Sequence, residues 1–174
     1  MYSRQTNRVL LNQMDSHDTM RMITRFESNA DRAKQALALL FSVPGTACIY
    51  YGTEILLEGG NDPDNRRCMP WKEIEEGRFD ETLSFMKKLI SLRKTHPALR
   101  SSIIQFNYGG ENADGKKRLI RYTKTAEDGG EKIEVIVNCT GEPVSAGNDG
   151  TVLLSKKLEN GKLLNDGFMY RLLQ

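Results

Sequence analysis

The hydrophobic positions of this chain change their spacing near residues 99–102. On the N-terminal side, short apolar runs alternate with segments in which apolar residues recur at helical spacing, a pattern typical of strands and amphipathic helices. On the C-terminal side, short β-prone runs alternate with Gly, Asn and Asp turns. The spacing therefore predicts an α/β part over residues 1–100 and an all-β part over residues 101–174.

The first part starts with the pattern of a strand, a helix and a second strand. Residues 9–11 and 46–51 are apolar runs without polar alternation, which is typical of strands buried on both faces of a parallel sheet. The helix predicted between them begins after Ser28, with Asp31 in the capping-box position, and ends before Pro44. Its apolar stripe consists of Ala30, Ala33, Leu37, Leu40 and Phe41. Two such strands cannot form a free-standing sheet, so we expect partner strands from another chain or from the rest of a larger barrel.

A long polar loop and a second helix complete this part. Residues 59–71 contain two adjacent arginines, two carboxylates and the only tryptophan, and this composition favours a functional loop over a disordered one. The second helix is predicted over residues 80–94, and His96 is expected near its last carbonyls. Its predicted apolar stripe is Phe79, Leu83, Met86 and Ile90. Lys87, Lys88 and Arg93 are expected to face water or the negative end of the helix dipole.

The second part has the pattern of an antiparallel meander or sandwich. Turn residues such as those at 128–130 and 148–150 separate its β-prone runs. The predicted strands are residues 103–108, 118–125, 132–138, 151–155 and 168–172. This part contains no histidine and few clusters that resemble a site.

Composition narrows the class of protein. The chain has 174 residues, of which 39 % are hydrophobic and 28 % charged, which is ordinary for a soluble globular protein. A net charge of +2 argues against nucleic-acid or anionic-membrane partners, and no apolar run has the length of a membrane span or a signal peptide. Cys48, Cys68 and Cys139 form no CxxC pair, which favours reduced thiols and a cytoplasmic location.

Two polar segments are candidates for chemistry. Asp15, Ser16, His17 and Asp18 follow the first strand, where a barrel or open sheet presents its site. The alternative is a polar turn that leads into the next helix. The loop at residues 62–67 has alternatives too: a simple turn with an internal salt bridge, or a calcium site with too few ligands, namely Asp62, Asp64 and Asn65.

Four segments carry a family resemblance, in order along the chain. They are Leu-Asn-Gln-Met-Asp-Ser-His-Asp-Thr (11–19) with Arg21, Pro-Gly-Thr through Ile-Tyr-Tyr-Gly (44–52), Gly-Gly-Asn-Asp-Pro-Asp-Asn-Arg (59–66) with Met69 and Trp71, and Leu-Arg-Lys-Thr-His-Pro-Ala-Leu (92–99). Together they resemble the C-terminal part of alpha-amylase family glycoside hydrolases, in the neopullulanase, cyclomaltodextrinase and maltogenic amylase branch. One departure is Thr53, which stands where the family usually has an acidic residue.

The resemblance implies a fold and a reaction. The fold would be the last part of a (β/α)8 TIM barrel, strands seven and eight with their helices, followed by a small antiparallel β-sandwich. The reaction would be retaining hydrolysis of α-glucans such as maltooligosaccharides, cyclodextrins, starch or pullulan, which needs a nucleophile and a general acid/base. In the family those two residues precede the matching region, so we expect this chain alone to be inactive. No cofactor and no metal are expected.

The resemblance also assigns residues. Asp18 would be the third family carboxylate, which stabilises the transition state, and His17 would donate to hydroxyls of the same sugar. Asp62 and Arg66 would bind sugars further toward the non-reducing end. Competing interpretations are a carbohydrate-binding or assembly module, and half of a split enzyme completed in trans. Because apolar strands would be exposed, we expect a homo-oligomer or association with the missing N-terminal barrel portion.

Overall fold

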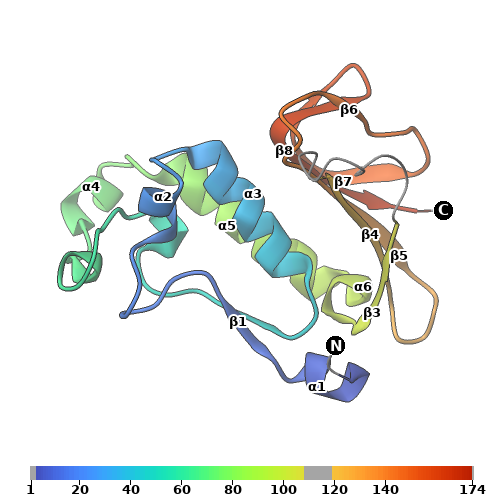
Figure 1. Cartoon of the computed structure of the whole chain (residues 1–174), viewed down its shortest axis with the longest axis horizontal. Coiled ribbons are helices and arrows are strands. Elements are labelled where there is room, and N and C mark those ends of the chain that lie inside the picture. The colour runs from blue at the N-terminus through green and yellow to red at the C-terminus, as the bar shows by residue number, and fades with distance from the viewer. Residues whose placement is uncertain (1–2, 108–118, 174) are drawn as a thin grey trace.

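The structure is a computed structural model that describes residues 3–107 and 119–173 (Figure 1). Short helices, two long helices and a pair of strands come first, and antiparallel strands follow. The helical elements are α1 (Arg4–Arg8), α2 (Met22–Arg25), α3 (Ala30–Ser42), η1 (Thr53–Ile55), η2 (Asp64–Arg66), α4 (Trp71–Glu75), α5 (Asp80–Thr95) and α6 (Pro97–Arg100). Within the described residues, none of these helices combines the length and the apolar character that crossing a membrane requires.

The strand–helix–strand pattern of the first part is confirmed. β1 (Leu11–Gln13) pairs in parallel with β2 (Thr46–Cys48), and α3 connects them. β1 lies two residues later than the run that predicted it, and β2 is shorter than its run. The expectation that both strands are buried on both faces is wrong in this chain, because Val9 is 79 % exposed, Leu11 is 65 % exposed and no residue of β2 is fully buried.

α3 occupies the predicted position with a different cap. Asn29, not Ser28, is the N-cap, because its side chain accepts a hydrogen bond from the Arg32 amide at 3.0 Å. Ser28 has a left-handed backbone with φ 59°, and its hydroxyl donates to Glu58 instead. The helix ends at Ser42, and Gly45 allows the turn that follows, since a Cβ there would lie 2.5 Å from the Leu10 carbonyl oxygen.

α5 is confirmed within one residue of its predicted end, but it buries another face. Met86, Leu89 and Leu92 are its buried residues, whereas Ile90 is 40 % exposed. Arg93 does not face water as predicted. It is half-buried and donates to the carbonyls of Phe41, Leu99 and Val43 at 2.6, 3.0 and 3.3 Å, which joins the end of α3 to α6.

His96 lies at the end of α5, and its side chain contacts the second part of the chain. Its Nδ1 atom is 2.7 Å from a carboxylate oxygen of Glu131, and the other oxygen of Glu131 accepts the Ala98 amide at 2.9 Å. The neighbouring Glu127 accepts hydrogen bonds from the backbone and side chain of Ser102 and from Ser101. These contacts fix the junction between the two parts.

The second part is an antiparallel sheet. Its strands are β3 (Ile103–Phe106), β4 (Leu119–Thr125), β5 (Lys132–Asn138), β6 (Val144–Ser145), β7 (Thr151–Glu159) and β8 (Lys162–Leu172). The order is β3-β4-β5-β8-β6, and β7 also pairs with β8, so the six strands form one curled sheet where the sequence predicted a sandwich. β6 was not predicted, and the expected strand residues 108 and 118 lie outside the described residues.

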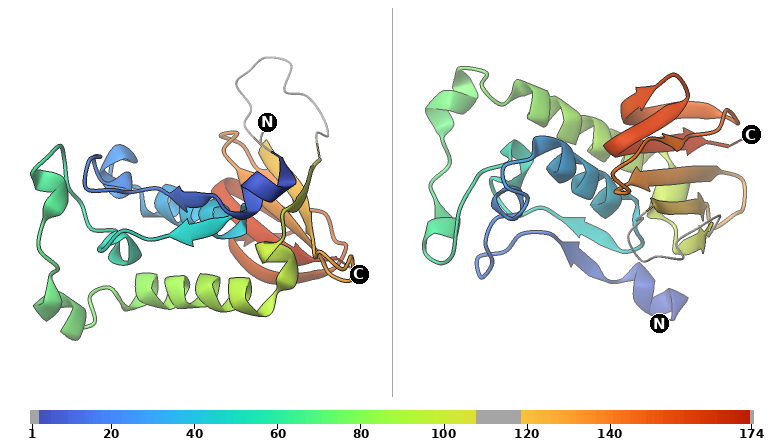
Figure 2. Two further views of the ribbon diagram at one scale, coloured as in Figure 1. Left: turned by 90° about the horizontal axis from the view of Figure 1, so that it is seen from below. Right: turned by 45° about the horizontal axis from the view of Figure 1, so that its top comes forward.

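One hydrophobic core joins the helices to this sheet. Figure 2 shows the long helices α3 and α5 beside the sheet. Leu37, Leu89 and Leu99 from the helices pack in one cluster with Val135 and Tyr170 from the strands. Each fully buried side chain of this size contributes about 1.5–3 kcal/mol relative to exposure. Burial also raises the pKa of Tyr170, whose hydroxyl donates to the Ala38 carbonyl in α3. The packing holds one end of the helices against the sheet, and the loops lie at their other end.

Candidate functional site

His17 and Asp18 lie in the turn that follows β1. His17 Nε2 is 3.1 Å from Asp18 Oδ1, and their side chains are 65 % and 71 % exposed. The turn is closed locally, since the Ser16 hydroxyl accepts the Asp18 amide at 3.2 Å and the Thr19 hydroxyl accepts the Ser16 amide at 3.2 Å. The two predicted side chains are therefore accessible and fixed at their base.

Asp62 and Arg66 lie in the loop around η2, next to this turn. Arg66 Nη2 is 2.9 Å from Asp62 Oδ2, and Arg66 Nε donates to the His17 carbonyl at 3.2 Å. Residues far apart in the sequence thus come together on one exposed surface. All four predicted site residues belong to this surface, and Arg66 connects the two loops.

Asn65 is a further member of this arrangement, although the sequence suggested it only as a ligand in the calcium alternative. It is fully buried, and its Nδ2 atom donates to the carbonyls of His17 at 2.7 Å and Thr19 at 3.1 Å. The amide therefore holds the backbone of the first loop against the second. For this role, the only signal in the sequence was that Asn65 lies in the segment 59–66 that resembles the family. Its contacts to His17 and Thr19 join positions far apart in the sequence, which a local pattern does not encode.

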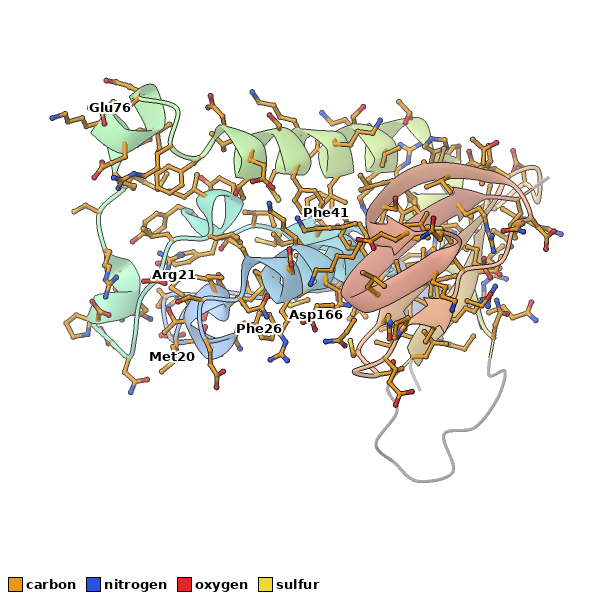
Figure 3. The ribbon with its side chains drawn as sticks, turned by 90° about the horizontal axis from the view of Figure 1, so that it is seen from above. Met20, Arg21, Phe26, Phe41, Glu76 and Asp166 are labelled. Carbon is orange, nitrogen blue, oxygen red and sulfur yellow. The ribbon has the colours of Figure 1, made fainter. Side chains whose placement is uncertain are left out.

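Arg21 holds Asn65 in place from the interior of the protein. It is fully buried, its Nε donates to the Asn65 carbonyl at 2.7 Å, and its Nη1 donates to the Tyr51 carbonyl at 2.5 Å. The guanidinium lies 4.4 Å from the centre of the Tyr50 ring and 4.6 Å from that of Tyr51, within cation–π range. Figure 3 shows Arg21 beside the η2 loop, at the end of the molecule away from the C-terminal sheet.

Asp15 differs from Asp18 in its surroundings. It is 4 % exposed and accepts the Met22 amide at 2.5 Å and the Thr53 hydroxyl at 2.8 Å, with Arg25 at 3.4 Å. Both carboxylate oxygens are therefore engaged by the protein. This contact also accounts for Thr53, because an acidic side chain there would bring a second carboxylate against a buried one.

The alternatives for the η2 loop are also visible in the structure. Besides the Asp62–Arg66 pair, Arg67 forms two bonds to Asp64, at 2.7 and 2.8 Å, which hold the pKa of Asp64 below its usual range. The acidic groups of the calcium alternative are thus paired with arginines, and Asn65 is used internally. Across residues 3–107 and 119–173, no three His, Cys, Asp or Glu side chains cluster as metal ligands would.

Comparison with known proteins defines the class to which this fold and site belong. Residues 1–102 match the family model for the alpha-amylase catalytic domain, so the chain belongs to the alpha-amylase family. It is 37 % identical over 164 residues to neopullulanase 2 of Thermoactinomyces vulgaris, covering 93 % of this chain and 25 % of that protein. It is 39 % identical over 126 residues to the intracellular maltogenic amylase of Bacillus subtilis, covering 72 % of this chain and 20 % of that protein.

A solved structure extends the likeness to the whole chain. A cyclomaltodextrinase structure superposes with a TM-score of 0.76 at 31 % identity, covering 99 % of this chain and 31 % of that one. Within the family, the chain therefore falls in the neopullulanase, cyclomaltodextrinase and maltogenic amylase branch. It spans only a fifth to a quarter of the length of these curated relatives.

Proposed function

We propose that this chain is the C-terminal portion of an enzyme that hydrolyses α-glucans with retention. In this proposal, residues 1–100 form the last part of a (β/α)8 barrel, and residues 101–174 form an all-β C-terminal domain. The parallel pairing of β1 with β2 through α3 supports the barrel assignment. The names of the relatives support the substrate class, namely maltooligosaccharides, cyclodextrins, starch or pullulan.

Asp18 is the proposed transition-state-stabilising carboxylate. Its exposed side chain can accept hydrogen bonds from sugar hydroxyls, and such bonds contribute several kcal/mol when they strengthen at an oxocarbenium-like transition state. His17, 3.1 Å away, is the proposed donor to the same sugar, and Asp62 and Arg66 contact the next sugars. The observation that carries the proposal is the Arg66 link, which brings the four side chains onto one surface.

Bond cleavage needs two further carboxyl groups about 5–5.5 Å apart, one as nucleophile and one as general acid/base. We assign neither role to a residue of this chain. Asp15, the nearest carboxylate along the sequence, is buried and fully hydrogen-bonded, so it cannot reach a substrate. The chain alone should therefore bind α-glucans without cleaving them.

The test combines the chain with the part of a relative that this chain does not match. Purified chain is incubated with maltotriose or β-cyclodextrin, alone and after co-refolding with the complementary N-terminal portion of neopullulanase 2. Product should form only in the combined sample, and Asp18→Asn should abolish it, while the exposed control Asp149→Asn should not. Hydrolysis by the chain alone that is lost in Asp18→Asn would overturn the assignment of an incomplete site.

Completion in trans is also favoured by an observation on β1. Val9 and Leu11 are 79 % and 65 % exposed, and each strand of the β1–β2 sheet has one partner among the described residues. Apolar strand edges of this kind drive association with another chain, either a second copy or the rest of a barrel. Light scattering should show concentration-dependent association, and Val9→Lys with Leu11→Lys should reduce it.

A cytoplasmic location is part of the proposal. Cys48, Cys68 and Cys139 are not joined by disulfides, which fits a reducing compartment. The Bacillus subtilis relative is named an intracellular enzyme. Fractionation of the source cells tests this point.

A further inference from the structure

The two loops of the proposed site are the turn that follows β1 and the loop around η2. Buried polar groups form most of the connection between them. On the surface, the connection is the single bond from Arg66 to the His17 carbonyl, at 3.2 Å. Beneath it, the Asn65 amide donates to two carbonyls of the first loop, at 2.7 and 3.1 Å. An exposed hydrogen bond competes with water and fixes geometry weakly, whereas the two bonds that the buried Asn65 Nδ2 donates fix it more strongly. The relative position of the loops therefore depends on Asn65.

Asn65 is itself held in place by the strand end. Arg21 donates to the Asn65 carbonyl and to the Tyr51 carbonyl, and its guanidinium contacts the neighbouring rings of Tyr50 and Tyr51. Tyr50 and Tyr51 follow β2, whose partner β1 leads into the turn that carries His17 and Asp18. Through Arg21, the loop with Asp62 and Arg66 is therefore connected to the same pair of strands that carries the turn after β1.

We infer that Asn65, anchored by Arg21, is a positioning residue that sets the spacing between two glucosyl-binding positions. This inference rests on the proposed function, in which the turn and the η2 loop contact successive sugars of one α-glucan. A glucan long enough to reach both loops gains affinity only if their spacing matches its repeat. Asn65 therefore controls how affinity rises with glucan length, and it does not itself touch the sugar.

The experiment uses a matched pair of buried asparagines. Asn138 in β5 is also fully buried, and its Nδ2 atom donates to two carbonyls, those of Glu142 and Leu163, both at 2.8 Å. Both Asn65→Ala and Asn138→Ala remove a buried Nδ2 that donates to two carbonyls, and Asn138→Ala also removes two bonds accepted from Thr140, so it is the more severe structural change. Only Asn65 lies at the site. Titration calorimetry of the full chain with maltose and with maltotetraose gives the dissociation constants.

The native chain should bind maltotetraose about tenfold more tightly than maltose, which corresponds to about 1.4 kcal/mol. In Asn65→Ala the two constants should become nearly equal, while Asn138→Ala should keep the native ratio even if its Tm falls. An unchanged ratio in Asn65→Ala would overturn the inference. If the ratio of the two dissociation constants were lost in both variants, the effect of Asn65 would be one of general stability. That result would overturn the inference as well.

A second measurement separates this inference from the proposed function. Without ligand, the 15N heteronuclear NOE values at residues 16–19 and 61–66 should fall in Asn65→Ala and not in Asn138→Ala. If the native chain binds neither sugar, the proposed function fails, and unchanged NOE values would also end the positioning role. Should Asn65→Ala not fold, Arg21→Lys serves instead, because it removes the Nε bond to Asn65 and keeps the charge.

Discussion

β1 and β5 lie in segments that the sequence predicts as strands, and the two strands have opposite environments. In β5, every residue from Ile133 to Asn138 is buried, whereas β1 has an exposed–intermediate–exposed pattern. β5 lies between β4 and β8, with the helices on one face and Ile136 in a small cluster inside the curl on the other. β1 has β2 alone. An apolar run thus predicts a strand, but neighbouring elements decide whether that strand is buried.

The largest expected effect comes from truncating one side chain in β5 and, for comparison, one in β1. Ile133→Ala should lower the free energy of unfolding by about 2–5 kcal/mol, because the side chain is fully buried in the shared core. Leu11→Ala should change it by less than about 0.5 kcal/mol, since Leu11 is 65 % exposed. Urea unfolding followed by circular dichroism measures both. Equal losses would mean that β1 is covered in solution.

Within the first part, the joint between the end of α3 and α6 is the next point to test. Arg93→Met removes four hydrogen bonds to backbone carbonyls that hold this joint, and should cost about 1–3 kcal/mol. Arg93→Lys should recover little of the lost stability, because an ammonium group cannot place its donors in the geometry of a guanidinium. The exposed Arg100→Met is the control. If Arg93→Lys were fully stable, charge rather than the hydrogen bonds would hold the joint.

Asp15 and Asp18 allow the same comparison of a buried with an exposed position inside the first part of the chain. Asp15→Asn should destabilise the chain by about 1–2 kcal/mol, because one acceptor of the Met22 amide or the Thr53 hydroxyl is lost. Asp18→Asn should stay within about 0.5 kcal/mol, since the side chain is 71 % exposed. Thermal unfolding of both variants checks this order. The reverse order would place the structural carboxylate at Asp18.

The smallest expected effect is a pH dependence at the junction. The Ser102 amide, followed by the hydroxyls of Ser102 and Ser101, lowers the pKa of Glu127 from 4.5 to about 2. Because the folded pKa lies below the unfolded one, this contribution is complete above pH 4.5 and is lost as the pH falls toward 2. The Tm difference between the native chain and Glu127→Gln should therefore shrink over that interval. The exposed Glu159→Gln should show no such change.

Local signals predicted much of the fold. The predicted bounds of β5 agree with the observed ones, and those of α5 differ by one residue at its end, because turn residues and helix stops delimit continuous patterns. The N-cap was misassigned, since Ser28 and Asn29 are both good caps and only the left-handed backbone of Ser28 separates them. The outward face of β1 was missed because burial depends on neighbours that a local pattern does not encode.

The site was predicted only in part. His17, Asp18, Asp62 and Arg66 came from resemblance, and the structure brings them onto one surface. Arg21 and Asn65, which support that surface, were not identified as a pair because they lie 44 positions apart in the sequence. Nothing local to either residue predicts the hydrogen bond between them. Their role follows from burial and contact geometry alone.

The most direct test of the central claim is a two-dimensional NMR titration of the full chain with maltotetraose. If the turn after β1 and the η2 loop bind α-glucan, amide shifts should change at residues 15–19 and 61–67 and stay constant across β5 and β8. Asp18→Asn should remove most of these changes without altering the spectrum of the sheet. Shift changes confined to the C-terminal sheet, or none at millimolar sugar, would contradict the account.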